Sequence, residues 1–265
     1  MKGFVLVAAM GHCGTKWLAE VFDGLPGVSF HHEFRCDMTG WPWHKCFRHE
    51  LEHGVIAKEF DGYWGQVEWE LGKHAVVGDS NTWTPYIVPQ VHHEALPVRR
   101  IFYLVRDGVM TMYSASRHSW VWRRAPEDSW YFDVFLRKYW KLMGCPDPQW
   151  EKRTRWEKLC TLWALNWPVY HWLKETLPDV PVTLHRLEDL TTDVNELRVL
   201  VEELSPGATI PDGELRQLQR QVVNRKEQER LTAGERWAMW TQTEREAFEV
   251  ICGEGMRGLG YEIPE

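Results

Sequence analysis

One feature of the sequence constrains the fold more than any other: an apolar run that ends in a glycine-containing turn and continues as a helical pattern. Residues 4–9 are all apolar, and Gly11 and Gly14 follow within the next five positions. From residue 15 to 22, apolar side chains recur at the spacing of one helix face. A short apolar run bounded by glycine is typical of a buried parallel strand. This segment therefore predicts a strand, a tight loop and a helix.

The rest of the chain continues this alternation. Further strands are expected at residues 28–31, 75–78, 100–105 and 180–184, and helices at residues 85–94, 109–117, 131–143, 155–177, 194–204 and 243–259. Residues 44–71 predict irregular helix and loop, and residues 119–130 a loop or lid. Such alternation predicts an α/β fold, with a central parallel β-sheet flanked by helices, as a single domain over residues 1–265. The loops that follow the strands would then meet along one edge of the sheet.

The first of these loops suits a phosphate or a phosphosulfate. Glycines let successive amides face an anion, and the N-terminus of the next helix adds free N–H groups and the positive end of its dipole. Thr15 adds a hydroxyl and Lys16 a cation. The usual nucleoside triphosphatase loop needs a Ser or Thr after its lysine to bind Mg²⁺, whereas Trp17 follows the lysine here. The loop therefore favours an anion held without a metal.

The loop resembles the 5′-phosphosulfate loop of sulfotransferases that use 3′-phosphoadenosine 5′-phosphosulfate (PAPS). That loop commonly contains Pro-Lys/Arg-Ser-Gly-Thr-Thr-Trp/Leu, and Gly14, Thr15 and Trp17 match it. His12 stands where the family has Lys or Arg, and Lys16 replaces the second Thr. The resemblance implies a P-loop NTPase-like sulfotransferase fold and a cytoplasmic enzyme that releases PAP. It also implies that PAPS contacts Gly11, His12, Cys13, Gly14, Thr15, Lys16 and Trp17, with His12 or Lys16 next to the transferring group.

A second motif of the same family follows the strand predicted at residues 100–105. In the family, an Arg at the end of a central strand and a Ser eight residues later bind the 3′-phosphate. Arg106 and Ser114 have that spacing. Arginine offers a planar fork of donors that suits phosphate oxygens. Near the C-terminus, Arg225 and Lys226 resemble the Arg-Lys pair that closes over the same phosphate, although a solvated charge cluster is an equal alternative.

Transfer to a hydroxyl needs a base for the acceptor proton. In the tyrosylprotein branch of the family this base is a Glu about eighteen residues after the first Thr of the loop, which corresponds to Glu33. His32 is the second candidate, and His31 is expected to contact the acceptor. Asp79 and Ser80 follow the strand predicted at residues 75–78 and are also expected to contact substrate. An N-cap of the next helix is an alternative role for Asp79.

Other functions are weaker. Residues 49–53 fit the zinc-protease pattern HExxH, but the flanks are polar and no third ligand has a suitable spacing, so no metal is expected. The hydroxyl that a P-loop kinase needs after its lysine is missing after Lys16, which disfavours a kinase. A catalytically inactive relative that binds nucleotide stays an alternative.

The net charge of −7 argues against nucleic-acid or membrane partners. Scattered cysteines indicate reduced thiols in the cytoplasm. The remaining partner is a hydroxyl-bearing acceptor of unknown identity.

Overall fold

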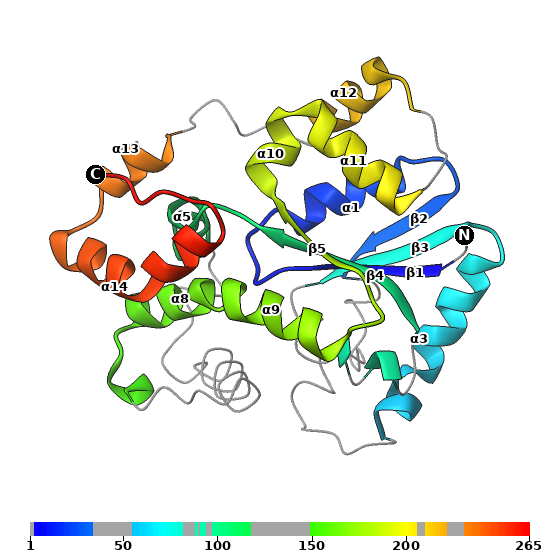
Figure 1. Ribbon diagram of the computed structural model, residues 1–265, viewed down its shortest axis with the longest axis horizontal. Coiled ribbons are helices and arrows are strands. Elements are labelled where there is room, and N and C mark those ends of the chain that lie inside the picture. The colour runs from blue at the N-terminus through cyan, green and yellow to red at the C-terminus, as the bar shows by residue number, and fades with distance from the viewer. Residues whose placement is uncertain are drawn as a thin grey trace. The chain divides into compact units, whose positions relative to one another are not determined.

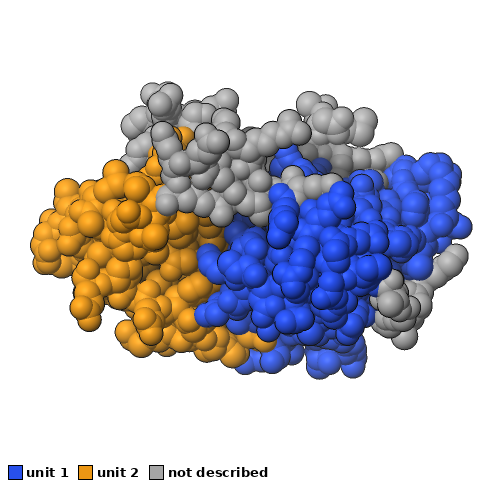
Figure 2. Space-filling view, turned by 90° about the horizontal axis from the view of Figure 1, so that it is seen from above, with its two compact units in different colours: residues 1–104, 173–227 blue, residues 105–172, 228–265 orange. Residues whose placement is uncertain are grey.

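The computed structural model describes residues 3–33, 55–81, 88–89, 91–93, 97–117, 149–205, 210–221 and 231–265. The chain divides into two compact units that alternate along it (Figure 2). The first unit comprises residues 1–104 with 173–227, and the second comprises residues 105–172 with 228–265. This division does not test the number of domains, so the single domain expected over residues 1–265 stays a prediction. Each unit is described by itself.

The first unit is built on a five-stranded parallel sheet with the order β2-β3-β1-β4-β5 (Figure 1). Its strands are β1 (Gly3–Ala8), β2 (Val28–His32), β3 (Val76–Asn81), β4 (Val98–Val105) and β5 (Val182–Arg186). Parallel strands place all their carboxyl ends on one edge, where β2, β3 and β1 end as neighbours. The predicted α/β fold with a central parallel sheet is confirmed.

Helices α1 (Thr15–Asp23), α10 (Leu187–Thr192), α11 (Val194–Leu204) and α12 (Asp212–Gln221) pack on one another and cover one face of this sheet (Figure 1). We call it the α1 face. Alternate strand residues such as Val5 and Val7 point into the core there. The rings of Phe22 and Phe30 meet edge to face with centroids 4.9 Å apart. Each such buried side chain contributes about 1.5–3 kcal/mol.

Helix α3 (Val55–Leu71) supplies side chains to the opposite face, which we call the α3 face. The ring of Tyr63 lies 6.1 Å from that of Phe4, centroid to centroid. Irregular helix and loop had been expected over residues 44–71, and for residues 55–71 that prediction is wrong, because they form one continuous helix. Within residues 61–71 only Tyr63 and Val67 are buried, one turn apart, so the apolar pattern is too sparse to indicate a helix. Residues 44–54 lie outside the described part.

The second unit is helical. It contains α5 (Gly108–Arg117), the short 3₁₀ turn η2 (Trp150–Lys152), α8 (Arg155–Ala164), α13 (Ala233–Ala238) and α14 (Gln242–Gly258). Helix α9 (Asn166–Thr176) begins in this unit and ends in the first. One helix had been expected over residues 155–177, but the chain breaks at Leu165 because Pro168 cannot donate an amide hydrogen to the preceding turn.

Tryptophans form much of the core of the second unit. Trp240 packs against Trp156, Trp237 and Phe248, with ring centroids 4.7, 5.2 and 5.3 Å away. Trp237 and Trp163 are each 2% exposed. These residues therefore stabilise the fold.

Candidate functional site

The loop after β1 has an unusual backbone. Gly11, His12 and Gly14 all have positive φ, at 93°, 56° and 84°. A left-handed conformation costs a residue with a Cβ about 1–2 kcal/mol, so His12 is held there by its surroundings. Cys13 is fully buried, and its thiol donates to the carbonyl of Gly11 at 3.1 Å. Left-handed residues thus flank Cys13 on both sides, and such a change of hand between neighbouring residues turns their amides to one side, as in an anion-binding nest.

Gly14 is fixed by packing as well as by its backbone. A Cβ at this position would lie 2.7 Å from Cδ1 and 2.8 Å from Cδ2 of Leu187. Leu187 begins α10 directly after β5. Beside it, the guanidinium of Arg186 donates to Asp189 through Nε at 2.6 Å and Nη2 at 2.8 Å. The β5–α10 turn thus holds the loop from one side, a contact that sequence patterns did not predict.

The N-terminus of α1 is open to an anion. Gly14 is the N-cap and has no side chain to accept from the first-turn amides, and no acidic residue lies in that turn. Thr15 is 5% exposed, whereas the Lys16 side chain is 74% exposed and lies 4.0 Å from Glu20. Trp17 is 8% exposed, and among the described residues its indole N–H has no hydrogen-bond acceptor. These features fit a bound phosphate or sulfate.

At the same edge, the ends of β2 and β3 are joined by hydrogen bonds. Nδ1 of His32 lies 2.9 Å from Oγ of Ser80, and the amide of Glu33 donates to the Ser80 carbonyl at 2.9 Å. Glu33 itself has a φ of 54°, a strained conformation for a residue with a side chain. Asp79 and Ser80 had been placed after the third strand, but they lie within β3, which extends to Asn81. His32, Glu33 and Ser80 are therefore held in one cluster.

The electrostatic surroundings favour neutral His32. Burial lowers its pKa below the usual 6.5, while the charge of Glu33 raises it and that of Lys16 lowers it. A hydrogen bond to the backbone of Ser80 also raises the pKa of His32. A neutral imidazole can accept a proton. Lys16 and Glu33, from two different elements, thus act on the same ring.

The side chains of His31 and Asp79 point to the face of the sheet opposite to that of His32 and Ser80. They are register partners on β2 and β3 and face α3, because successive side chains alternate between the faces of a sheet. Asp79 is fully buried and accepts a hydrogen bond from the Tyr63 hydroxyl at 3.1 Å. Burial lowers the pKa of His31, and Asp23 and Glu70 oppose that effect. Tyr63 was not anticipated, because no helix was expected around it.

In the second unit, Arg106 begins the turn between β4 and α5. Its carbonyl accepts from the indole N–H of Trp163 at 3.0 Å, and Asp107 caps α5 by accepting from the Met110 amide at 2.9 Å. A Cβ on Gly108 would lie 2.8 Å from the Phe248 ring. The Arg106 side chain is half-buried. Packing of this turn therefore fixes the backbone position of Arg106.

Ser114 lies two turns along α5 and is half-buried. The preceding residue, Tyr113, has the guanidinium of Arg236 over its ring, 3.6 Å from the centroid. Arg236 is only 8% exposed and donates through Nε to the Leu231 carbonyl at 3.0 Å. Arg117 donates to the Tyr113 hydroxyl. Arg236 thus lies beside the helix that carries Ser114, and Arg117 is the last residue of that helix; neither was predicted.

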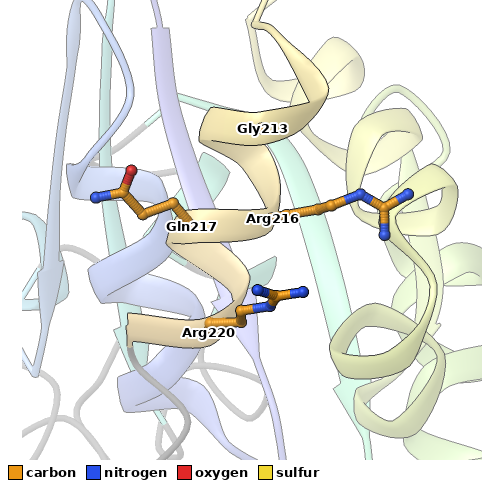
Figure 3. Close-up of a pocket in the computed structure, with 4 residues that line it drawn as sticks. All are labelled: Gly213, Arg216, Gln217 and Arg220. Carbon is orange, nitrogen blue, oxygen red and sulfur yellow. The ribbon is translucent and has the colours of Figure 1, made fainter.

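Several features discussed from the sequence lie outside the described residues, namely Arg225, Lys226, the HExxH segment at 49–53, the loop or lid at 119–130 and the helix at 131–143. Among the residues that are described, no cluster of three possible metal ligands occurs, and no helix is long and apolar enough to cross a membrane. A shallow pocket lies on α12, where Arg216 and Arg220 extend to one side and Gln217 to the other (Figure 3). None of the predicted site residues is among the four that line it.

No protein-family model matches the sequence, and no curated protein matches it. Solved structures do match. A sulfotransferase domain from the curacin biosynthetic pathway aligns with a TM-score of 0.54 and 12% identity, over 100% of this chain and 99% of that one. A sulfotransferase from Alicyclobacillus acidocaldarius aligns with a TM-score of 0.52 and 13% identity, over 98% of this chain and 94% of that one. The chain therefore has the α/β fold of these sulfotransferase domains.

Proposed function

We propose that the protein transfers a sulfuryl group from PAPS to an acceptor hydroxyl and releases PAP. The observation that carries this proposal is the loop at residues 11–14, with its left-handed residues and the open helix N-terminus that follows. The fold adds support, because domains of this fold include sulfotransferases. The amides of this loop would bind the 5′-phosphosulfate, with Thr15 and Lys16 contributing a hydroxyl and a charge.

The 3′-phosphate is proposed to bind Arg106 and Ser114, with Arg225 and Lys226 as further donors. Arginine binds phosphate with two parallel N–H bonds, each charge-assisted. The hydrogen bond from Trp163 and the close packing at Gly108 fix the backbone of the turn that carries Arg106. The next residue, Asp107, accepts from the Met110 amide and so caps α5.

The acceptor proton is proposed to leave through the end of β2, to Glu33 or His32. The acceptor oxygen then attacks sulfur, the sulfur–oxygen bond to the nucleotide breaks, and the electron pair of that bond stays on the departing phosphate. Cations near the loop, Lys16 and a protonated His12, would offset the charge that develops there. Ser80, which contacts His32, is proposed to lie beside the acceptor, whereas His31 and Asp79 face α3 and are not proposed as acceptor contacts.

Calorimetry with PAP tests this proposal. We expect binding in the presence of EDTA, because no step requires a metal, and we expect Arg106→Ala to weaken it by more than tenfold, since a charged hydrogen bond contributes about 1.5–3 kcal/mol. Arg153→Ala, at a site remote in sequence from every proposed contact, serves as the control and should leave the affinity unchanged. Absence of PAP binding, together with ATP hydrolysis that requires Mg²⁺, would instead favour a P-loop kinase. Binding without turnover for any acceptor would favour an inactive relative.

A further inference from the structure

The end of β3 presents polar side chains to both faces of the sheet. Asp79 and Ser80 are consecutive and fully buried, and successive side chains of a strand point to opposite faces. On the α1 face, Oγ of Ser80 lies 2.9 Å from Nδ1 of His32. On the α3 face, the carboxylate of Asp79 accepts from the Tyr63 hydroxyl at 3.1 Å. The backbone of these two residues therefore joins a contact on one face to a contact on the other.

This end of β3 has little tendency of its own to form a strand. Residues 78–81 are Gly-Asp-Ser-Asn, and Gly, Asp and Asn are depleted in strands. Buried polar side chains also lose their hydrogen bonds to water, so partners within the protein must replace them. The strand nevertheless continues to Asn81. Hydrogen bonds to the side chains of Asp79 and Ser80 therefore stabilise the last residues of β3.

Tyr63 is well placed to hold this strand end. Its ring is buried and lies edge to face against Phe4 of β1, the middle strand of the sheet, with centroids 6.1 Å apart. Phe4 is the register partner of Val77, which lies two residues before Asp79 on the same face of β3. The ring thus packs on β1 while its hydroxyl donates to β3. Packing of the ring therefore fixes the position of the hydroxyl.

Both proposed bases depend on the same strand end. Ser80 is the register partner of His32, and its carbonyl accepts from the Glu33 amide at 2.9 Å. Glu33 directly follows β2, an edge strand, and its φ of 54° persists only where neighbouring contacts determine it. If β3 ended at Gly78, His32 would lose the Ser80 hydroxyl and Glu33 would lose the carbonyl. The position of both bases is thus linked to residues on the opposite face.

We propose that Tyr63 is a positioning residue for the proposed bases and that it acts through Asp79 and the end of β3. Tyr63 is not itself proposed to contact substrate. The inference rests on the proposed function, in which His32 or Glu33 takes the acceptor proton. Loss of the Tyr63 hydroxyl leaves an acceptor of the buried Asp79 without its donor, so the strand end opens more often and the bases leave their positions with it.

Hydrogen exchange at single amides, followed by nuclear magnetic resonance without any ligand, tests this link. Tyr63→Phe removes the hydroxyl and keeps the ring. We expect the Glu33 amide to exchange about tenfold faster in this variant, the order of effect that one unsatisfied buried acceptor produces. An unchanged exchange rate at Glu33, together with a lowered free energy of unfolding, would overturn the proposal, because Tyr63 would then contribute to global stability alone.

Ser29→Ala is the matched control on the α3 face. The Ser29 hydroxyl also joins the sheet to α3, because it donates to Oε2 of Glu70 at 3.3 Å, and it lies 3.2 Å from Nε2 of His31. The register partner of Ser29 is Val77, which precedes the polar end of β3. Ser29→Ala should therefore leave the exchange of the Glu33 amide unchanged. Equal acceleration in both variants would show a general loosening of the α3 face and would also overturn the proposal.

Turnover gives a second measure of the same link. With water as the acceptor and PAP release as the signal, Tyr63→Phe should lower kcat for PAPS hydrolysis by about tenfold, within the roughly 10²–10⁴-fold that a general base provides. The KM for PAPS should be unchanged, because the variant leaves the loop after β1 intact. A raised KM at constant kcat would contradict the proposal, since the change would then act on donor binding.

Two further outcomes are kept apart by the design. If Tyr63→Phe does not fold in buffer, all the proteins are measured in sucrose, which favours the compact state of each. Failure of the proposed function itself would appear as absent PAP binding in calorimetry, whereas the exchange of the Glu33 amide would still be measurable and would still decide whether Tyr63 holds the strand end.

Discussion

Replacing Gly14 with alanine should damage the loop in two separable ways. The residue has a φ of 84°, and a left-handed alanine costs about 1–2 kcal/mol. The added Cβ would also lie 2.7 Å from Cδ1 of Leu187, and relieving such overpacking costs about 1–3 kcal/mol. Leu187 can shift in part, because the contact is with the end of its side chain. We therefore expect Gly14→Ala to lower the free energy of unfolding by about 2–4 kcal/mol.

Gly27 provides the control for the backbone alone. It has a φ of 74°, and a Cβ there would have no atom within 4 Å. Gly27→Ala should therefore lower the free energy of unfolding by about 1–2 kcal/mol, the cost of the conformation without the collision. Urea unfolding followed by circular dichroism measures both variants in the same protein. The difference between them isolates the contact with Leu187.

A double-mutant cycle makes the assignment sharper. Combining Gly14→Ala with Leu187→Ala removes the collision, so the two changes together should cost less than the sum of their separate effects, by about 1–2 kcal/mol. The reasoning is refuted if Gly14→Ala is no more destabilising than Gly27→Ala, or if the two changes are additive. In PAP calorimetry Gly14→Ala should weaken binding while Gly27→Ala does not, since only Gly14 belongs to the proposed anion loop.

Two further predictions concern stability. Tyr63→Phe removes the hydroxyl that donates to the fully buried Asp79 at 3.1 Å, and should lower the free energy of unfolding by about 1–3 kcal/mol in urea; an unchanged value would mean that this bond contributes nothing. Burial, helped by the charge of Arg100, lowers the pKa of His185 to about 4. The unfolded chain protonates this ring below about pH 6.5 but the folded one does not, so stability should fall by about 2–3 kcal/mol between pH 6.5 and pH 4. His185→Gln should flatten that part of the pH profile, and an equal slope in both proteins would contradict the assignment.

The first strand, loop and helix could be predicted because their signals are local. The apolar run of β1, the glycines of the loop and the helical spacing of α1 all lie within residues 3–23. The structure places the helix start at Thr15, as the sequence indicates. What local patterns could not indicate is the contact between Gly14 and Leu187, which brings together residues far apart in the chain.

The end of β3 shows the opposite case. The apolar pattern stops at Val77, and Gly78, Asp79 and Ser80 have the composition of a turn. They continue the strand because residues distant in sequence form hydrogen bonds with their side chains: Tyr63 donates to Asp79, and His32 contacts Ser80. Buried polar side chains require such hydrogen-bond partners, and no local sequence pattern indicates which residues they are. Asp79 and Ser80 were thus assigned to a loop, although they lie within the strand.

Strain and hydrogen bonding coincide at the sheet edge. His12 and Glu33 are the non-glycine residues with positive φ in the described ranges; Glu33 directly follows β2, and His12 lies in the loop between β1 and α1. Each such conformation costs about 1–3 kcal/mol and persists only where neighbouring contacts determine it. For Glu33 the contact is its amide hydrogen bond to the Ser80 carbonyl. Ser80 therefore contacts both proposed bases, His32 through its hydroxyl and Glu33 through its backbone carbonyl. Ser80→Ala removes only the hydroxyl, so it should disturb His32 and leave the backbone hydrogen bond of Glu33 in place, whereas Ser29→Ala on the α3 face should disturb neither.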